Sequence, residues 1–211
     1  MTTDVQAAGS PSRGPVRDAV ARFGAGLIAS AVLGALLGLL WGEVAPRAVL
    51  QQVAAGEATI MNAETRAFIV ADAWFCGIAL IAGLITGIAG YRFLIARVGA
   101  AGDRDAYLRR AAGAAGLILG ALAGALLMMW IGGLIGLSAY QHALATSHPG
   151  ATYQSSLSLG AKSGLAFWPL ITSMMILVAE WSARRDSRSA PEAAPAAEGP
   201  FGYPQSAPPA P

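Results

Sequence analysis

Three charged residues stand at the ends of apolar segments, where they are the best candidates for an ion-pairing site. Glu43 ends the first segment, Asp72 begins the second and Lys162 begins the fourth. Ionisable groups beside lipid are costly to bury and therefore often have a function. If these segment ends converge, Lys162 pairs with Asp72 or Glu43 and fixes the helix register. The alternative is three separate side chains that extend into water.

Other residue types that could support chemistry are scarce. His142 and His148 are six positions apart and share no helical face, whereas zinc usually takes three or four protein ligands. Cys76 is the single cysteine and lies in an apolar segment, so it is predicted to be a small buried core residue. Paired catalytic carboxylates and an HExxH motif are absent from the sequence. We therefore predict no enzymatic activity, no metal site and no cofactor.

The composition indicates a protein whose solvent is lipid. Of 211 residues, 55% are hydrophobic and 12% are charged. Soluble domains are about 25% charged, so this chain has too few polar groups to cover a globule of its size. The arginines stand beside apolar runs rather than on one soluble face, so nucleic acid is not an expected partner. The expected partner is the lipid bilayer.

Four uncharged apolar segments predict an all-α membrane protein with four transmembrane helices. About 20 apolar residues cross a bilayer core as a helix. The predicted helices are about 22–42, 63–96, 110–139 and 161–184. The third is longer than one span needs, so it protrudes, tilts or breaks at Gly132-Gly133. The first apolar stretch exceeds the 7–15 residues of a signal-peptide core, which favours a retained anchor over a cleaved signal.

Two local patterns stand in the fourth segment. Pro169 lacks a backbone N–H and predicts a kink, with Thr172 and Ser173 able to relieve the freed carbonyl. Glu180 and Arg184 are four residues apart on one helical face, which predicts a weak ion pair that anchors the helix end.

The distribution of basic residues predicts the orientation. Placing both termini and the loop between the second and third helices in the cytoplasm puts 11 of the 14 Lys and Arg residues on that side. We therefore expect a multi-pass protein of the cell membrane with cytoplasmic N- and C-termini. Aromatic residues near the outer ends of the segments are predicted to form an interfacial belt: Trp41, Trp74, Phe75, Trp130, Tyr140, Phe167 and Trp168.

The rest of the chain divides into two tails and one structured loop. Residues 1–16 and 186–211 are rich in small residues and Pro and are predicted to be disordered, flanking a transmembrane domain at 17–185. Between Glu43 and Asp72, strands at 44–53 and 58–61 with a turn at Gly56 predict a small extracytoplasmic hairpin or cap. Asn62 is then the expected N-cap of the second helix.

Small residues recur at every fourth position in the first and third helices. The first helix carries Gly26, Ser30, Gly34, Gly38 and Gly42, and the third carries Gly116, Gly120 and Gly124. Such a ladder lets another helix backbone approach closely. It is expected to pack within the bundle, and the alternative is a face for homo-oligomers or a larger membrane complex.

The first and third helices also resemble each other. The sequence GLIASAVLGALL from Gly26 aligns with GLILGALAGALL from Gly116, and Ala73-Trp74-Phe75 has a counterpart in Ala166-Phe167-Trp168. This similarity suggests two helical hairpins in the same orientation, a parallel repeat.

Several short motifs point to a family. They are the segment from Trp41 to Pro46, the segment from Ala71 to Phe75, a Gly-rich third helix and Phe167-Trp168-Pro169. Over about residues 20–182 the chain resembles small actinobacterial four-helix integral membrane proteins that form a domain-of-unknown-function family. The resemblance implies a fold and brings no activity, ligand or site residue.

Three classes of function remain open. The glycine ladders and the lack of charge at mid-membrane depth favour an accessory or structural component of the cell membrane. The alternative is a small oligomeric transporter or channel subunit, in which several copies supply the polar lining. An intramembrane enzyme is the least favoured class because no catalytic motif is present.

Overall fold

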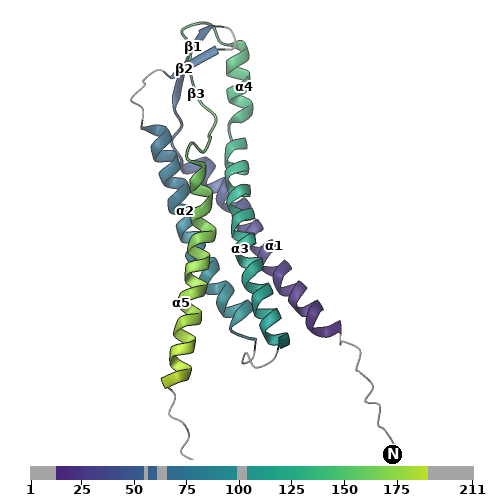
Figure 1. Cartoon of the computed structure of the whole chain (residues 1–211). Helices are drawn as coiled ribbons and strands as arrows, with labels where there is room; N and C mark the ends of the chain where they lie inside the picture. Colours follow the sequence, from purple (N-terminus) through teal and green to yellow (C-terminus); the bar gives the residue numbers. More distant parts are fainter. Residues whose placement is uncertain (1–12, 55–56, 61–65, 99–103, 190–211) are drawn as a thin grey trace, which may run out of the picture.

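A computed structural model of the chain describes residues 13–54, 57–60, 66–98 and 104–189. It is mostly helical, with a small antiparallel sheet (Figure 1). The elements in order are α1 (Arg13–Val44), β1 (Val49–Ala54), β2 (Glu57–Ile60), α2 (Ala67–Gly90), the π-helical turn η1 (Tyr91–Ile95), α3 (Arg104–Leu134), α4 (Leu137–Thr146), β3 (Thr152–Gln154), the 3-10 helix η2 (Lys162–Ala166) and α5 (Phe167–Ser189).

The helices form a bundle with two distinct ends. The three strands and α4 lie at one end, which we call the sheet end (Figure 1). The start of α1 and the end of α5 lie at the other, which we call the terminal end (Figure 1). Within the bundle α1 packs along α3, α2 packs along α5, and α5 also contacts α3.

The prediction of four membrane-crossing helices is confirmed in its coarse form. In the described residues, four helical segments are long and apolar enough to span a bilayer: Gly14–Val44, Ala67–Ile95, Arg104–Thr146 and Lys162–Asp186. Large apolar side chains cover the outer faces of these helices: Ile28, Val32, Leu36, Ile81, Ile85, Ile88, Leu119, Leu170 and Leu177 are each at least 49% exposed. An apolar surface of this extent needs lipid rather than water around it.

The glycine ladder lies between α1 and α3. A Cβ atom built on Gly34 would lie 2.5 Å from the Cα of Gly124, and one on Gly38 would lie 2.8 Å from the carbonyl oxygen of Met128. From the other side, a Cβ on Gly120 would lie 2.8 Å from the carbonyl oxygen of Gly26. The two backbones therefore touch over several turns, which only residues without side chains permit.

The other residues of the ladder also lie in the contact between α1 and α3. Gly116 faces the backbone of Phe23, Gly42 faces the side chain of Ile135, and Ser30 is 1% exposed. Gly132, which follows Gly124 and Met128 at the same spacing, receives the ring of Trp41.

The predicted outer aromatic belt is only partly correct. Trp41, Phe75 and Trp168 are completely buried and form the centre of the apolar core. Trp41 meets Phe75 edge to face with ring centroids 5.3 Å apart, and the Trp168 ring covers Gly124. They are buried because glycines on the facing helices leave room for large rings. Trp74, Trp130 and Phe167 are exposed, as a belt requires.

The sheet end contains more structure than a hairpin. The strand order is β2-β1-β3, and Leu50 of β1 pairs with Ile60 on one side and Tyr153 on the other. β3 and the second part of α4 come from the uncharged segment at 141–160, whereas α4 begins at Leu137, within the predicted third helix. The Gln52 side chain is 2% exposed and donates to the carbonyl of Leu144 at 3.3 Å, which fastens the sheet to α4.

Two predicted helix irregularities occur at different positions. The break after α3 falls at 135–136, beyond Gly132-Gly133, where Gly136 adopts φ 81°, a left-handed conformation that favours glycine. Pro169 causes no interruption of α5, because the chain changes from 3-10 to α-helix at Phe167. Pro169 therefore lies in the first turn, where its missing N–H costs little. The Ser173 hydroxyl donates to the Pro169 carbonyl at 2.7 Å.

Both outer helices extend beyond their predicted ends. α1 begins at Arg13 and α5 continues to Ser189, whereas residues 1–16 and 186–211 were predicted to be disordered. Pro15 is compatible with the first turn of α1, where a proline needs no N–H partner. Gly56 and Asn62, and residues 1–12 and 190–211 of the predicted tails, lie outside the described residues.

Replacing Gly34 with Leu should strongly destabilise the bundle, because the new side chain would collide with the Gly124 backbone. Overpacking of this kind typically costs about 1–3 kcal/mol or more. Gly24→Leu on the same helix is the matched control, since a Cβ there meets nothing within 4 Å. Thermal unfolding in mild detergent measures the difference. Equal unfolding temperatures for the two variants would show that the ladder is not the main α1–α3 contact.

Candidate functional site

The three predicted charged residues do not form one cluster. The structure places Glu43 at the end of α1 and Lys162 at the start of η2, and both are exposed. In the part of the chain that the structure describes, Lys162 makes no ion pair with Asp72 or Glu43. Of the two arrangements that the sequence left open, the ion pair of Lys162 is therefore not formed.

Asp72 instead binds backbone. Its two carboxylate oxygens accept hydrogen bonds from the N–H groups of Gly160 at 3.0 Å and Ala161 at 2.9 Å. A Cβ on Gly160 would lie 3.1 Å from the carboxylate, so the loop approaches closely because a glycine is there. Asp72 thus fastens the segment before η2 to the first turns of α2. Two amide donors on consecutive residues satisfy a carboxylate as well as a lysine does.

Arg47, a charged residue of the loop after α1, has a structural role that no sequence motif indicated. Arg47 donates from Nη2 to the carbonyl of Gly42 at 2.8 Å and lies 3.5 Å from that of Ile135. These carbonyls stand at the C-terminal ends of α1 and α3, where unsatisfied acceptors and the helix dipole favour a cation. Arg47 therefore joins two helix ends. Its position five residues after Gly42 is the only sequence signal for this role.

A polar network crosses the buried contact between α2 and α5. The indole Nε1 of Trp168 donates to the Thr86 hydroxyl at 3.0 Å, and the hydroxyls of Thr86 and Thr172 are 3.0 Å apart. Thr86 also donates to the Ala82 carbonyl at 2.8 Å. Trp168 and Thr172 are completely buried. Inside lipid these groups have no water to bind, so they bind each other.

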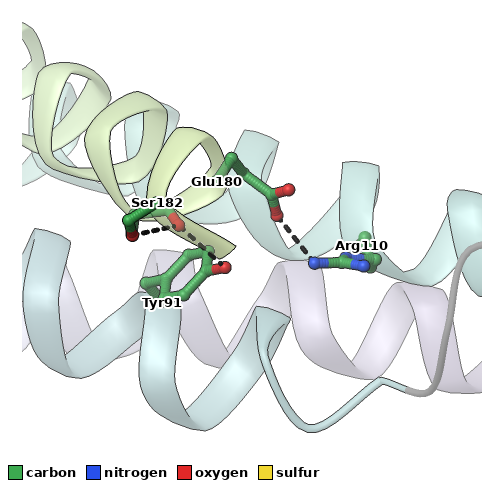
Figure 2. Close-up of polar contacts among 5 residues, drawn as sticks. Tyr91, Arg110, Glu180 and Ser182 are labelled. Atoms are coloured by element: carbon green, nitrogen blue, oxygen red, sulfur yellow. Dashed lines mark hydrogen bonds and ion pairs between the residues drawn. The ribbon is translucent and has the colours of Figure 1, made fainter. Parts of the chain in front are cut away.

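The terminal end holds an ion pair between distant helices. Arg110 of α3 donates from Nη2 to the Glu180 carboxylate of α5 at 2.8 Å, and the two side chains are 22% and 26% exposed (Figure 2). Glu180 therefore pairs with an arginine of a neighbouring helix, and its predicted pair with Arg184 is wrong. Beside this pair the Tyr91 hydroxyl donates to the Ala179 carbonyl at 3.4 Å (Figure 2).

A small cavity at the sheet end is also lined partly by polar residues. It measures about 150 Å³ and is lined by Arg47, Gly136, Tyr140 and Tyr153 among others. The Tyr153 hydroxyl is buried without a hydrogen-bond partner. Burial raises the pKa of Tyr153, and the neighbouring Tyr140 raises it further, so the phenol is a neutral group at physiological pH.

The two histidines and the cysteine take no part in these hydrogen bonds and ion pairs. His142 and His148 are exposed, and Cys76 is half-buried beside Gly164. Among the described residues, no three His, Cys, Asp or Glu side chains are grouped closely enough to hold a metal ion.

No family model, curated protein or solved structure matches this chain. The resemblance to actinobacterial four-helix membrane proteins therefore stays a prediction, and the site must be interpreted from its own geometry.

Because Asp72 binds backbone amides, Asp72→Ala should destabilise the protein by about 1 kcal/mol, at the low end for hydrogen bonds to a charged group because the site is exposed. Lys162→Met should have almost no effect, and the double variant should equal the sum of the two. Denaturation of all three in detergent provides the double-mutant cycle. A coupling energy clearly above experimental error would restore the ion pair.

Thr86→Val should destabilise the bundle more than Thr172→Val. Removing the Thr86 hydroxyl leaves the Trp168 indole without an acceptor, whereas removing that of Thr172 leaves the Trp168–Thr86 bond intact. Hydrogen bonds between membrane helices contribute about 0.6–1.7 kcal/mol. Thermal unfolding reports the difference, with Ser182→Ala, an exposed hydroxyl on α5, as control. Equal losses would mean that Thr86 is not the centre of the network.

Proposed function

We propose that this chain is an accessory or structural component of the cell membrane that packs against other membrane proteins. The observation that carries the proposal is that its polar side chains bind other parts of the same chain. Asp72, Arg47, Thr86 and Arg110 each hold two separate chain segments together. Side chains committed in this way stiffen a scaffold and have little capacity left to bind a substrate.

The membrane placement is part of this proposal. We infer that the terminal end is cytoplasmic and that the sheet end is extracytoplasmic, on the basis of the positive-inside rule. Arg17, Arg92, Arg97, Arg109 and Arg184 all belong to the terminal-end portions of the helices. The sheet and α4 then form an extracytoplasmic cap. The cap exposes Val49 and Val53 by 45% and 54%, which gives it apolar area for a partner.

The parallel repeat is also kept as a proposal. In such a repeat α1 corresponds to α3 and α2 corresponds to α5. α1 and α3 both run from the terminal end toward the sheet end, and α2 and α5 both run in the opposite direction (Figure 1), as two helical hairpins in the same orientation would.

A small oligomeric transporter or channel subunit is the alternative function. The buried hydroxyls of Thr86 and Thr172 are hydrogen-bonded to each other rather than arranged along a path. Any conducting path would therefore have to run between copies.

The experiment combines in-cell photo-cross-linking with bilayer recording. A photoreactive residue at Val53 samples the cap, and one at Leu177, which is 69% exposed, samples the lipid-facing side of α5. An accessory protein should give a discrete cross-link to a different protein from at least one of these positions. The purified chain should add no conductance to a planar bilayer.

The control is the same chain with Gly34→Leu, which should lose the cross-link because the bundle is disrupted. A homo-oligomer of fixed size that conducts ions would refute the accessory role and establish the alternative. Cross-links to lipid alone from both positions would also contradict it.

A further inference from the structure

An apolar groove opens toward lipid between α1 and α2. It has a volume of about 300 Å³ and is lined on α1 by Gly26, Ala29 and Leu33, on α2 by Ile85 and Ala89, on η1 by Phe93 and on α3 by Leu117. The lining on α1 runs from Ala25 to Leu33, about 12 Å along the helix at 1.5 Å per residue. The groove is therefore long, narrow and apolar, which are the dimensions and chemistry of a hydrocarbon chain.

Two arginines stand at the end of this groove nearest the terminal end. Arg22 of α1 donates from Nη1 to the Leu94 carbonyl at 2.9 Å, and its Nε atom is buried without a hydrogen-bond acceptor. The Arg97 guanidinium lies over the Phe93 ring, 4.8 Å from its centroid. Leu94 and Phe93 both line the groove, so both cations contact its wall at this end, which we call its mouth, although neither arginine is itself among the lining residues.

The charge at the mouth is only partly offset. Asp18 approaches Arg22 at 3.9 Å, but the Asp18 side chain is 57% exposed and is screened by water and salt. Arg97 is exposed. An anion with an apolar tail would place its charge at these arginines and its tail between the helices.

We propose that the α1–α2 groove binds one anionic phospholipid, with the phosphate at Arg22 and Arg97 and an acyl chain between Ala29 and Ala89. The proposal rests on the membrane placement given above, in which this end faces the cytoplasmic leaflet. Such clefts between helices with basic residues at the leaflet surface are the usual form of anionic lipid sites. The bound lipid fills the space that α1 leaves when it packs along α3 instead of α2.

The test is native mass spectrometry of the full-length protein in mild detergent, titrated with phosphatidylglycerol or phosphatidylcholine that carry identical chains. The wild-type protein should bind one phosphatidylglycerol at least fivefold more tightly than phosphatidylcholine. Arg22→Gln and Arg97→Gln should each reduce phosphatidylglycerol affinity about fivefold, because one cation near an anionic headgroup contributes on that scale. Ala29→Trp should fill the groove and weaken both lipids.

Matched controls separate the site from general effects. Arg92→Gln removes a cation that lines a different hollow beside Met175, and Ile28→Trp enlarges an exposed position next to Ala29 that does not line the groove. Both should bind like the wild type, and all variants should retain their thermal unfolding temperature within a few degrees.

Three results would overturn the proposal. Equal binding of the two lipids would show that the arginines do not select an anionic headgroup. Unchanged binding by Ala29→Trp would place any lipid elsewhere. A homodimer that Ala29→Trp abolishes would identify a second copy as the occupant. None of these results bears on conductance, so the lipid site and the accessory function can fail independently.

Discussion

The direct contact between the backbones of α1 and α3 determines the rest of this structure. Lipid tails solvate apolar side chains as well as another helix does, so helices in a bilayer gain from association mainly where their backbones come close. Gly34 against Gly124 and Gly38 against Met128 provide that closeness. Once the two helices are joined, the flanking glycines become sockets for large rings. Trp41 fills the space at Gly132, and Trp168 fills the space at Gly124.

Polar side chains fix the relative orientation of the helices that the glycines bring into contact. The apolar core has no directional preference, and helices held only by dispersion can rotate or slide. The hydrogen bonds of Trp168 with Thr86, of Asp72 with Gly160 and of Arg47 with Ile135, and the ion pair of Arg110 with Glu180, fix the rotation and depth of each helix against a neighbour. Each joins residues far apart in sequence, so each costs chain entropy to form. In a low-dielectric setting the penalty for leaving such groups unpaired is larger still.

The sequence was sufficient to predict the helices but not the side-chain contacts between them. Runs of about 20 apolar residues identify spans because length and composition alone determine whether a helix can cross a bilayer. The ladder spacing placed the close-packing residues on one face of α1 and one face of α3. The predictions that failed were those about which side chain meets which. Lys162 was a candidate partner for Asp72, yet the backbone amides of Gly160 and Ala161 bind this carboxylate.

The same limit explains the other differences. Glu180 pairs with Arg110 rather than Arg184 because helix packing brings the distant residue within 2.8 Å, and no local spacing encodes that distance. Trp41 and Trp168 resemble interfacial aromatics in sequence, but their burial depends on glycines of other helices. β3 arises from a segment without hydrophobic alternation, because it forms by adding to an existing strand edge. Tertiary partners, rather than local propensity, decided each of these cases.

The groove between α1 and α2 follows from the same constraint that organises the core. The ladder face of α1 packs along α3, and two of its residues, Gly26 and Ser30, also line the groove. The side that α1 turns toward α2 carries Ala25 and Ala29, which are too short to reach Ala89 and Gly90. A soluble protein would close such a gap by collapse, because water cannot fill apolar space favourably. In a bilayer no such pressure exists, since lipid chains enter the gap at little cost. An opening between two of the four helices is therefore a stable part of this fold, and the arginines at its mouth favour one class of lipid in it.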